Sequence, residues 1–166
     1  QNAKSISAGG YSTCAVLLDD VIKCWGANST GQLGNGGTAT SVTSPTTVST
    51  VSPNLVAKYL EVGATHTCAI STVGAAWCWG SYGSGRLGTT ATSNALQPTA
   101  TAALAASATQ VAAGDAHTCV LLATKKIQCF GSNSNGQIGQ ALTTTSNSTP
   151  TTVTLGGDST GITAGG

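Results

Sequence analysis

The sequence predicts an all-β protein built from tandem four-stranded blades of the propeller type. One stretch, which runs from cysteine to cysteine and continues with an aromatic residue and glycine, occurs three times, at residues 14–26, 68–80 and 119–131. The copies start 54 and then 51 positions apart, and turn residues separate short β-prone runs within each of them. Tandem units of about 50 residues with four strands each are typical of propeller blades.

The repeat divides the chain into three units and a remainder. We expect blade-like repeats at residues 3–56, 57–108 and 109–158, and either the first strand of a further repeat or a strand donated to a neighbouring subunit at residues 159–166. Each unit opens with a short apolar strand that ends in glycine, and a second strand starts near the first cysteine. Turn residues follow at Asp19-Asp20, Val73-Gly74 and Thr124-Lys125, and a third strand then leads into the second cysteine.

A polar turn with paired glycines follows the third strand of every unit. The glycines suit backbone conformations with positive φ, and the aliphatic residue before the second glycine is expected to plug the core. These aliphatic residues are Leu33, Leu87 and Ile138. The fourth strand is expected to begin at a proline, because proline is tolerated at the start of an edge strand. The prolines are Pro45, Pro98 and Pro150, and the alanine-rich residues 101–108 are interpreted as strand, with helix as the alternative.

The six cysteines form three identically spaced pairs, which indicates disulfides and an oxidising compartment. With Asp19 at the hairpin apex, Cys14 falls opposite Cys24, Ala15 opposite Lys23, and Val16 opposite Ile22. Residues opposed in this way lie close enough for a disulfide, so each pair should staple its own hairpin. The expected disulfide cysteines are Cys14 and Cys24, Cys68 and Cys78, and Cys119 and Cys129.

The recurring Ala-Gly-x-x-His-Thr and Trp-Gly-x-Asn-x-x-Gly-Gln-Leu-Gly patterns resemble the regulator of chromosome condensation repeat. The resemblance covers essentially the whole chain, and it implies β-propeller blades of a fold that normally closes with seven. A secreted bacterial member of this family, an inhibitor of β-lactamase, binds proteins with the face of its ring. The cysteine pairs depart from the family pattern and favour an exported version, whereas the basic features of the chromatin-associated members have no match.

Three units are too few to close a ring, since propellers use four to eight blades. Residues 161–166 repeat the pattern of residues 5–10 and sit one period after Gly114. The free blade ends should therefore expose an assembly edge, with Ile6, Ile162 and Gly165 as its residues. Three arrangements stay open: part of a longer chain, a six-bladed ring of two copies, or copies stacked end to end in a filament, with residues 161–166 completing a sheet in the next subunit.

Composition argues against several other functions. Charged residues make up 7% of the chain and the formal net charge is +1, so no nucleic-acid partner is expected. No apolar run is long enough for a membrane helix, and no membrane insertion is expected. The cysteine spacing and two isolated histidines do not fit a metal site, and the glycine turns lack the Gly-Lys-Ser/Thr of a phosphate-binding loop. We expect no enzyme activity and no cofactor, because no non-repeating polar cluster stands out.

Most conspicuous side chains recur from unit to unit, which favours structural roles. His66 and His117 occupy equivalent positions, where structural hydrogen bonds are expected. Trp77 and Tyr82 break the repeat and are the better candidates for a specific contact surface. Two N-x-Ser/Thr sequons, at Asn28 and Asn147, fall in expected loops and are possible glycosylation sites. The aromatic residues expected in blade packing are Trp25, Trp79 and Phe130.

Two functions remain after these exclusions. The first is an extracellular or cell-surface structural protein whose blades self-assemble into a filament or a composite ring, with copies of itself as partners. The alternative is a fragment of a longer secreted propeller that binds another extracellular protein, as an inhibitor or adhesin does.

Overall fold

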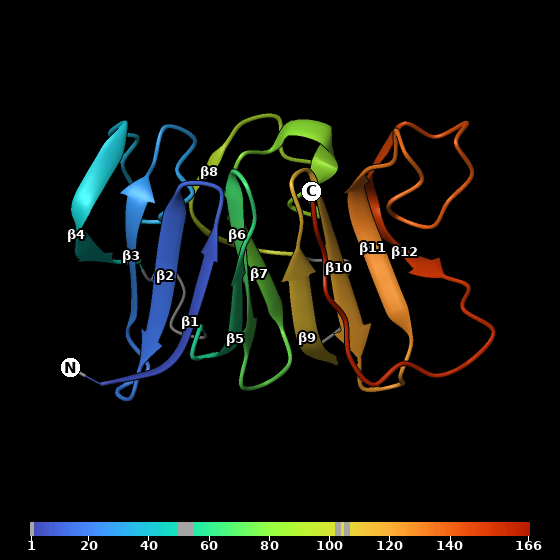
Figure 1. Ribbon diagram of the computed structural model, residues 1–166, viewed down its shortest axis with the longest axis horizontal. Helices are drawn as coiled ribbons and strands as arrows, with labels where there is room; N and C mark the ends of the chain where they lie inside the picture. The colour runs from blue at the N-terminus through green and yellow to red at the C-terminus, as the bar shows by residue number, and fades with distance from the viewer. Residues whose placement is uncertain (1, 50–54, 102–103, 105–106) are drawn as a thin grey trace.

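The computed structural model describes residues 2–49, 55–101, 104 and 107–166, and it shows three antiparallel four-stranded sheets side by side (Figure 1). Each sheet consists of four consecutive strands, and we call the sheets blades 1, 2 and 3. The described residues contain one short 3-10 turn, η1, and no α-helix. The elements are β1 (Ala3–Gly9), β2 (Ser12–Leu17), β3 (Ile22–Ala27) and β4 (Ser41–Thr47) in blade 1; β5 (Ala57–Val62), β6 (His66–Ser71), β7 (Ala76–Gly80), η1 (Gly83–Gly85) and β8 (Ala95–Ala100) in blade 2; β9 (Ala108–Ala113), β10 (His117–Leu122), β11 (Ile127–Ser132) and β12 (Ser146–Val153) in blade 3.

The central hairpin of each blade has the register that residue counting predicts. Cys14 pairs with Cys24, and the neighbouring predicted pairs of β2 and β3 are confirmed. The cysteines of the other two blades are opposed in the same way. At the tip of each hairpin one residue has a left-handed backbone: Asp20 (φ 69°), Gly74 (φ 80°) and Lys125 (φ 66°). The hairpin geometry is thus repeated even where the turn residue is not glycine.

The expectation that each outer strand begins at its proline is wrong. The strands start earlier, and each proline lies inside its strand, in a bulge of three residues. The bulges, residues 43–45, 96–98 and 148–150, stand opposite the aromatic residue that follows the second cysteine. Proline fits there because the bulged residues make no ladder hydrogen bonds. Of the alanine-rich run, Ala108 opens β9, and residues 102–103 and 105–106 lie outside the described residues.

The apolar core lies between the blades. Between blades 1 and 2, the Cys14–Cys24 hairpin and Leu33 pack against Leu60 and Trp79. Between blades 2 and 3, the Cys68–Cys78 hairpin and Leu87 pack against Val111 and Phe130. Each blade therefore uses one face toward the blade before it and the opposite face toward the blade after it.

The innermost strands β1, β5 and β9 lie next to one another, and residues 161–166 continue this row without pairing in a sheet (Figure 1). A row of glycines marks the close approach. A Cβ on Gly63 would lie 2.5 Å from the carbonyl oxygen of Gly114, and a Cβ on Gly114 would lie 2.6 Å from that of Gly165. Residues 161–166, which we call the tail, thus occupy the inner-strand position of a blade that would follow blade 3.

Candidate functional site

Two kinds of surface follow from the packing of one blade on the next. The exit face of a blade carries the disulfide, the aliphatic plug and the carbonyl oxygen before that plug. The entry face carries the inner strand, the threonine before the first cysteine and the aromatic residue after the second. Blades 1 and 2 join one exit face to one entry face, and so do blades 2 and 3.

The glycine turn on the exit face is held by a buried asparagine. In blade 1, the side-chain oxygen of Asn28 accepts a hydrogen bond from the backbone N–H of Leu33 (3.0 Å). Its Nδ2 donates to Asn35 Oδ1 (3.1 Å) and to the Gly37 carbonyl (3.0 Å). Asn133 holds Ile138 in the same way in blade 3. The turn is therefore rigid, and it presents the carbonyl of the residue before the plug.

In the interface of blades 1 and 2, two donors of blade 2 meet on one carbonyl of blade 1. Thr67 Oγ1 donates to the Gln32 carbonyl oxygen (2.8 Å), and Trp79 Nε1 donates to the same oxygen (3.0 Å). All three groups are buried, so these hydrogen bonds are shielded from water. Together they fix the position of blade 2 on blade 1.

The interface of blades 2 and 3 keeps the threonine and replaces the indole. Thr118 Oγ1 donates to the Arg86 carbonyl (2.9 Å), and Phe130, the equivalent of Trp79, has no N–H to give. His66 of blade 2 supplies the second hydrogen bond instead, with Nε2 2.9 Å from Thr118 Oγ1. Because the Thr118 proton goes to Arg86, His66 must donate from Nε2, and it is the neutral imidazole with the proton on that nitrogen.

Burial lowers the pKa of His66 to about 3, and the positive charges of Arg86 and His117 act in the same direction. His66 Nδ1 is buried without a hydrogen-bond partner. His117, which is half-buried, also has a pKa lowered by burial, with the Asp115 carboxylate opposing that shift. Neither histidine lies in a metal-ligating cluster: the described residues hold no group of three His, Cys, Asp or Glu side chains that fits a metal ion.

Arg86, which stands where the other blades have glutamine, ties blades 2 and 3 together at their rim. Its Nη1 donates to Thr65 Oγ1 (2.7 Å) and to the Asp115 carbonyl (2.9 Å). Sequence reasoning missed this residue, and it missed Thr67 and Thr118 as well. The signal was present, because the threonine recurs in every unit, but its acceptor is a backbone carbonyl that the sequence does not mark.

The two outer blades each leave one face open. On the entry face of blade 1, Ile6 is 67% exposed, whereas its equivalent Leu60 is 6% exposed. Trp25 and Thr13 are half-buried there, and neither side chain makes a hydrogen bond within the described residues. On the exit face of blade 3, Cys129 and Ile138 are covered, but Leu155 is exposed.

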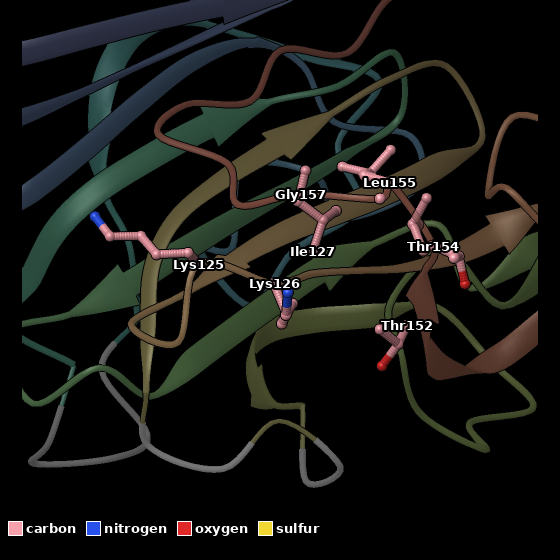
Figure 2. A pocket seen from close by; sticks show the side chains of 9 residues that line it. Lys125, Lys126, Ile127, Thr152, Thr154, Leu155 and Gly157 are labelled. Atoms are coloured by element: carbon pink, nitrogen blue, oxygen red, sulfur yellow. The ribbon is translucent and has the colours of Figure 1, made fainter.

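The exit face of blade 3 is hollowed. Cys119, Ile127, Cys129 and Val153 line a hollow of about 290 Å³, and residues 161–163 of the tail, which include Ile162, also line it. A second hollow, of about 340 Å³, lies next to it between the Lys125-Lys126 hairpin tip and residues 152–157, and Ile127 and Leu155 line both hollows (Figure 2). The first hollow lies where the next blade packs in the two internal interfaces. The second corresponds to a hollow at Ile22 and Val48 of blade 1, which stays open beside blade 2.

The structure places the remaining candidates as follows. Trp77 is half-buried beside the core of blades 1 and 2, with its Nε1 buried and unpartnered. Tyr82 is 43% exposed and takes the position of the bracing asparagine in blade 2. Asn28, one of the two sequon asparagines, has a buried side chain whose Nδ2 donates two hydrogen bonds within the turn. Asn147 lies in β12, not in a loop, and is half-buried.

The described cysteines are all bonded: Cys14–Cys24, Cys68–Cys78 and Cys119–Cys129 form three disulfides, with Cα atoms 4.1 Å apart in each. No described helix has the length and apolar character needed to span a membrane. Repeated four-stranded sheets that join exit face to entry face define a repeat protein of the β-propeller class.

Comparison with known proteins gives the family. The regulator of chromosome condensation (RCC1) repeat matches residues 24–70 and 74–121, and a second pattern for the same repeat matches residues 3–32 and 108–137. The chain therefore belongs to the RCC1 repeat family.

Similar curated proteins include the ultraviolet-B receptor UVR8 of Arabidopsis thaliana, 36% identical over 81% of this chain and 30% of that protein. The probable E3 ubiquitin-protein ligase HERC6 of Homo sapiens is 32% identical over 83% of this chain and 14% of that protein. The chain thus spans less than a third of the length of either relative.

Among solved structures, human WBSCR16 has a TM-score of 0.85 at 20% identity and covers 98% of this chain and 42% of its own. Yeast RCC1 (Prp20), in its structure bound to Kap60, has a TM-score of 0.84 at 19% identity and covers 93% of this chain and 37% of its own. At these identities the likeness establishes the propeller fold.

Proposed function

We propose that the chain is a non-enzymatic extracellular structural protein whose blades associate with those of further copies, building a filament or a composite ring. One observation carries the proposal: the open exit face of blade 3 and the open entry face of blade 1 are the two halves of an interface that the chain already forms twice. An end-to-end contact of this kind is heterologous, and it gives rings when the rotation closes and filaments when it does not.

The polar groups of the two open faces complement each other. The Gln137 carbonyl of blade 3 receives no hydrogen bond within the described residues, and it is equivalent to the Gln32 and Arg86 carbonyls. Thr13 and Trp25 of blade 1 are equivalent to the two side chains that donate to Gln32. A second copy can therefore supply both donors that the Gln137 carbonyl lacks.

The apolar groups fit in the same way. Leu60 and Val111 cover the disulfides of blades 1 and 2. An exposed isoleucine or leucine at a blade end is removed from water when the next blade docks, which stabilises the contact by about 1.5–3 kcal/mol for each side chain that becomes fully buried. The disulfides support an oxidising, extracellular location.

The alternative is that the chain supplies three blades of a longer secreted propeller that binds another protein. Its support is the share of solved propellers that the chain covers, 37% for yeast RCC1 and 42% for human WBSCR16. Yeast RCC1 is described bound to Kap60, and Prp20p with binding properties to Gsp1p and histones, so propellers of this family bind proteins.

The test compares two substitutions of similarly exposed apolar residues. Leu155→Arg, at 54% exposure, places a charge on the exit face of blade 3, whereas Val73→Arg, at 66% exposure, places it on the hairpin tip of the middle blade. Sedimentation velocity over a range of concentrations, with negative-stain images, should show assemblies for the wild type and for Val73→Arg but single copies for Leu155→Arg. A wild-type chain that stays monomeric throughout the range would contradict self-assembly and leave the alternative.

A further inference from the structure

We infer that the tail of one copy, residues 161–166, pairs with β2 of a second copy and takes the place of that copy's own β1. This inference rests on the self-association proposed above, and it names the strand that joins the copies. The partner of the tail's unpaired edge is then blade 1 of another chain. That blade binds in two ways: its sheet gains the tail as a strand, and its entry face packs on blade 3.

The tail is an inner strand without a sheet. Ile162 lines the same hollow as Cys119 and Cys129, and Gly165 approaches Gly114 as Gly114 approaches Gly63. Yet residues 161–166 have no strand partner among the described residues, and the polar contact of their backbone is one hydrogen bond from the Ile162 N–H to Gln110 Oε1 (3.3 Å). The backbone groups along this edge are available for a ladder.

The tail matches β1 better than it matches the other inner strands. Residues 162–166 are Ile-Thr-Ala-Gly-Gly, and residues 6–10 are Ile-Ser-Ala-Gly-Gly. The corresponding residues are Leu-Glu-Val-Gly-Ala in blade 2 and Val-Ala-Ala-Gly-Asp in blade 3. A strand that resembles β1 in particular fits the sheet of blade 1 in particular.

The hydroxyl that the tail and β1 share has a use in blade 1. Ser7 Oγ accepts a hydrogen bond from the Val62 N–H (3.0 Å) and donates to Glu61 Oε2 (3.0 Å), which links β1 to β5. Thr163 is the tail residue at this position, and its hydroxyl can make both bonds. The equivalent residues, Glu61 in blade 2 and Ala112 in blade 3, have no hydroxyl group and cannot make this pair of hydrogen bonds.

The exchange of the tail for β1 follows from steric exclusion, because two strands cannot occupy one position. When blade 1 of a second copy docks on blade 3, its β1 and the tail compete for the same inner-strand position. The tail already contacts blade 3. When it pairs with β2 of the second copy, it can form each backbone hydrogen bond that β1 formed there. The exchanged arrangement therefore keeps the hydrogen bonds of blade 1 and adds a covalent path from one copy into the sheet of the next.

The register gives a direct test. In β1, Ala8 lies opposite Thr13, and Ser7 lies opposite Cys14. Cys14 forms its close pair with Cys24, so its N–H and carbonyl point toward β1 and the pair Ala8–Thr13 is the narrow one, with Cα atoms about 4.5 Å apart. In the exchanged assembly Ala164 takes the place of Ala8, and Thr13 of the second copy lies within disulfide distance of it.

In the double variant Thr13→Cys, Ala164→Cys, oxidation of the assembled protein should yield covalent multimers on a non-reducing gel. Within one copy these positions are separated by blade 2 (Figure 1). The reference variant Ala8→Cys, Thr13→Cys should be unable to close its bridge in assemblies. A bridge between residues 8 and 13 in assembled material, without one between 13 and 164, would overturn the exchange and leave the self-association intact.

A second pair of variants tests one backbone hydrogen bond between the tail and β2. Thr163→Pro deletes the N–H that would bond the Cys14 carbonyl, whereas Thr160→Pro falls at the position of Lys4, where the β1 register is interrupted. We expect Thr163→Pro to abolish assembly and Thr160→Pro to assemble as the wild type does. Equal assembly of both variants would overturn the inference, and a wild type that never assembles would overturn the proposed function with it.

Discussion

His66 Nε2 lies 2.9 Å from Thr118 Oγ1, across the boundary between blades 2 and 3. The interface of blades 1 and 2 has instead the Trp79 indole, which donates directly to the acceptor carbonyl of Gln32. The two interfaces share an acceptor carbonyl and a threonine, and they differ in the third group. Because His66 can take up a proton, the stability of the interface between blades 2 and 3 depends on pH.

Stability should fall as the pH falls from about 6.5 toward 3. The pKa of His66 is lowered by burial to about 3, while the unfolded chain has the ordinary value of 6.5. Between these values the unfolded chain takes up a proton that the folded chain does not, so the free energy of unfolding decreases by about 1.4 kcal/mol per pH unit. Above pH 7 this effect is absent.

Urea unfolding at pH 6.5 and pH 4.5 measures it. The wild type should lose about 2–3 kcal/mol more than His66→Gln, whose amide can still donate to Thr118 but does not titrate. His117 is retained in both proteins, so its contribution cancels. Equal pH dependence in the two proteins would mean that His66 is accessible to protons in the folded state.

Thr118→Val should destabilise the chain by about 1–3 kcal/mol, because it leaves the Arg86 carbonyl and the His66 Nε2–H buried and unpaired. Thr13→Val is the matched control, since Thr13 is the same residue of blade 1 and makes no side-chain hydrogen bond within the described residues. Its effect should stay within about 0.5 kcal/mol for a single copy. Thermal unfolding at low protein concentration compares the two, and similar losses would refute the role of the shared carbonyl.

The hairpins were predictable from the sequence because their pattern is local. Ten-residue cysteine spacing and a central turn determine which residues face each other, and the pairs counted from Asp19 agree with the structure. The paired glycines were also predictable, since their positive φ is a property of the residue itself. Gly31 and Gly34, for example, have φ values of 81° and 68°.

The interface groups were not predictable in the same way. Thr67 and Gln32 are 35 positions apart, and the acceptor is a backbone carbonyl, so no side-chain pattern reports the bond. The sequon at Asn28 suggested a surface loop, whereas the asparagine is the buried brace of the turn. The prolines were misplaced because a bulge within an edge strand accommodates a missing N–H as well as a strand start does.

Asn28→Ala should cost about 1–3 kcal/mol, because the Leu33 N–H loses its acceptor in a buried turn. Asn147→Ala, at the other sequon, removes a half-buried side chain whose Oδ1 accepts a hydrogen bond from the nearby Thr149 N–H. Its effect should be within about 0.5 kcal/mol. Denaturant unfolding distinguishes the two, and a neutral Asn28→Ala would show that water can replace the brace.

Lys125→Gly should stabilise blade 3 by about 0.5–1 kcal/mol, because Lys125 adopts a left-handed backbone that costs a non-glycine residue energy. Gly74→Ala, at the equivalent position of blade 2, should destabilise by a similar amount. Gly157→Ala controls for the loss of glycine flexibility in the unfolded chain, since nothing lies within 4 Å of its Cβ position. Opposite signs for Lys125→Gly and Gly74→Ala in thermal unfolding are the expected result, and equal signs would show that the hairpin tips differ.

Removing one disulfide should destabilise the blade whose central hairpin it bridges. The Cys14→Ala, Cys24→Ala variant reopens a loop of about ten residues in the unfolded chain, which should lower the free energy of unfolding by roughly 2–3 kcal/mol. It also leaves a gap beside Leu33 and Trp79, so the loss should exceed that of Cys119→Ala, Cys129→Ala, whose bridge lies on the open exit face of blade 3. Intact mass before and after reduction should first show two hydrogens gained per bridge in the wild type. A larger loss from the blade 3 variant than from the blade 1 variant, measured on single copies, would mean that the exit face of blade 3 is already packed in solution.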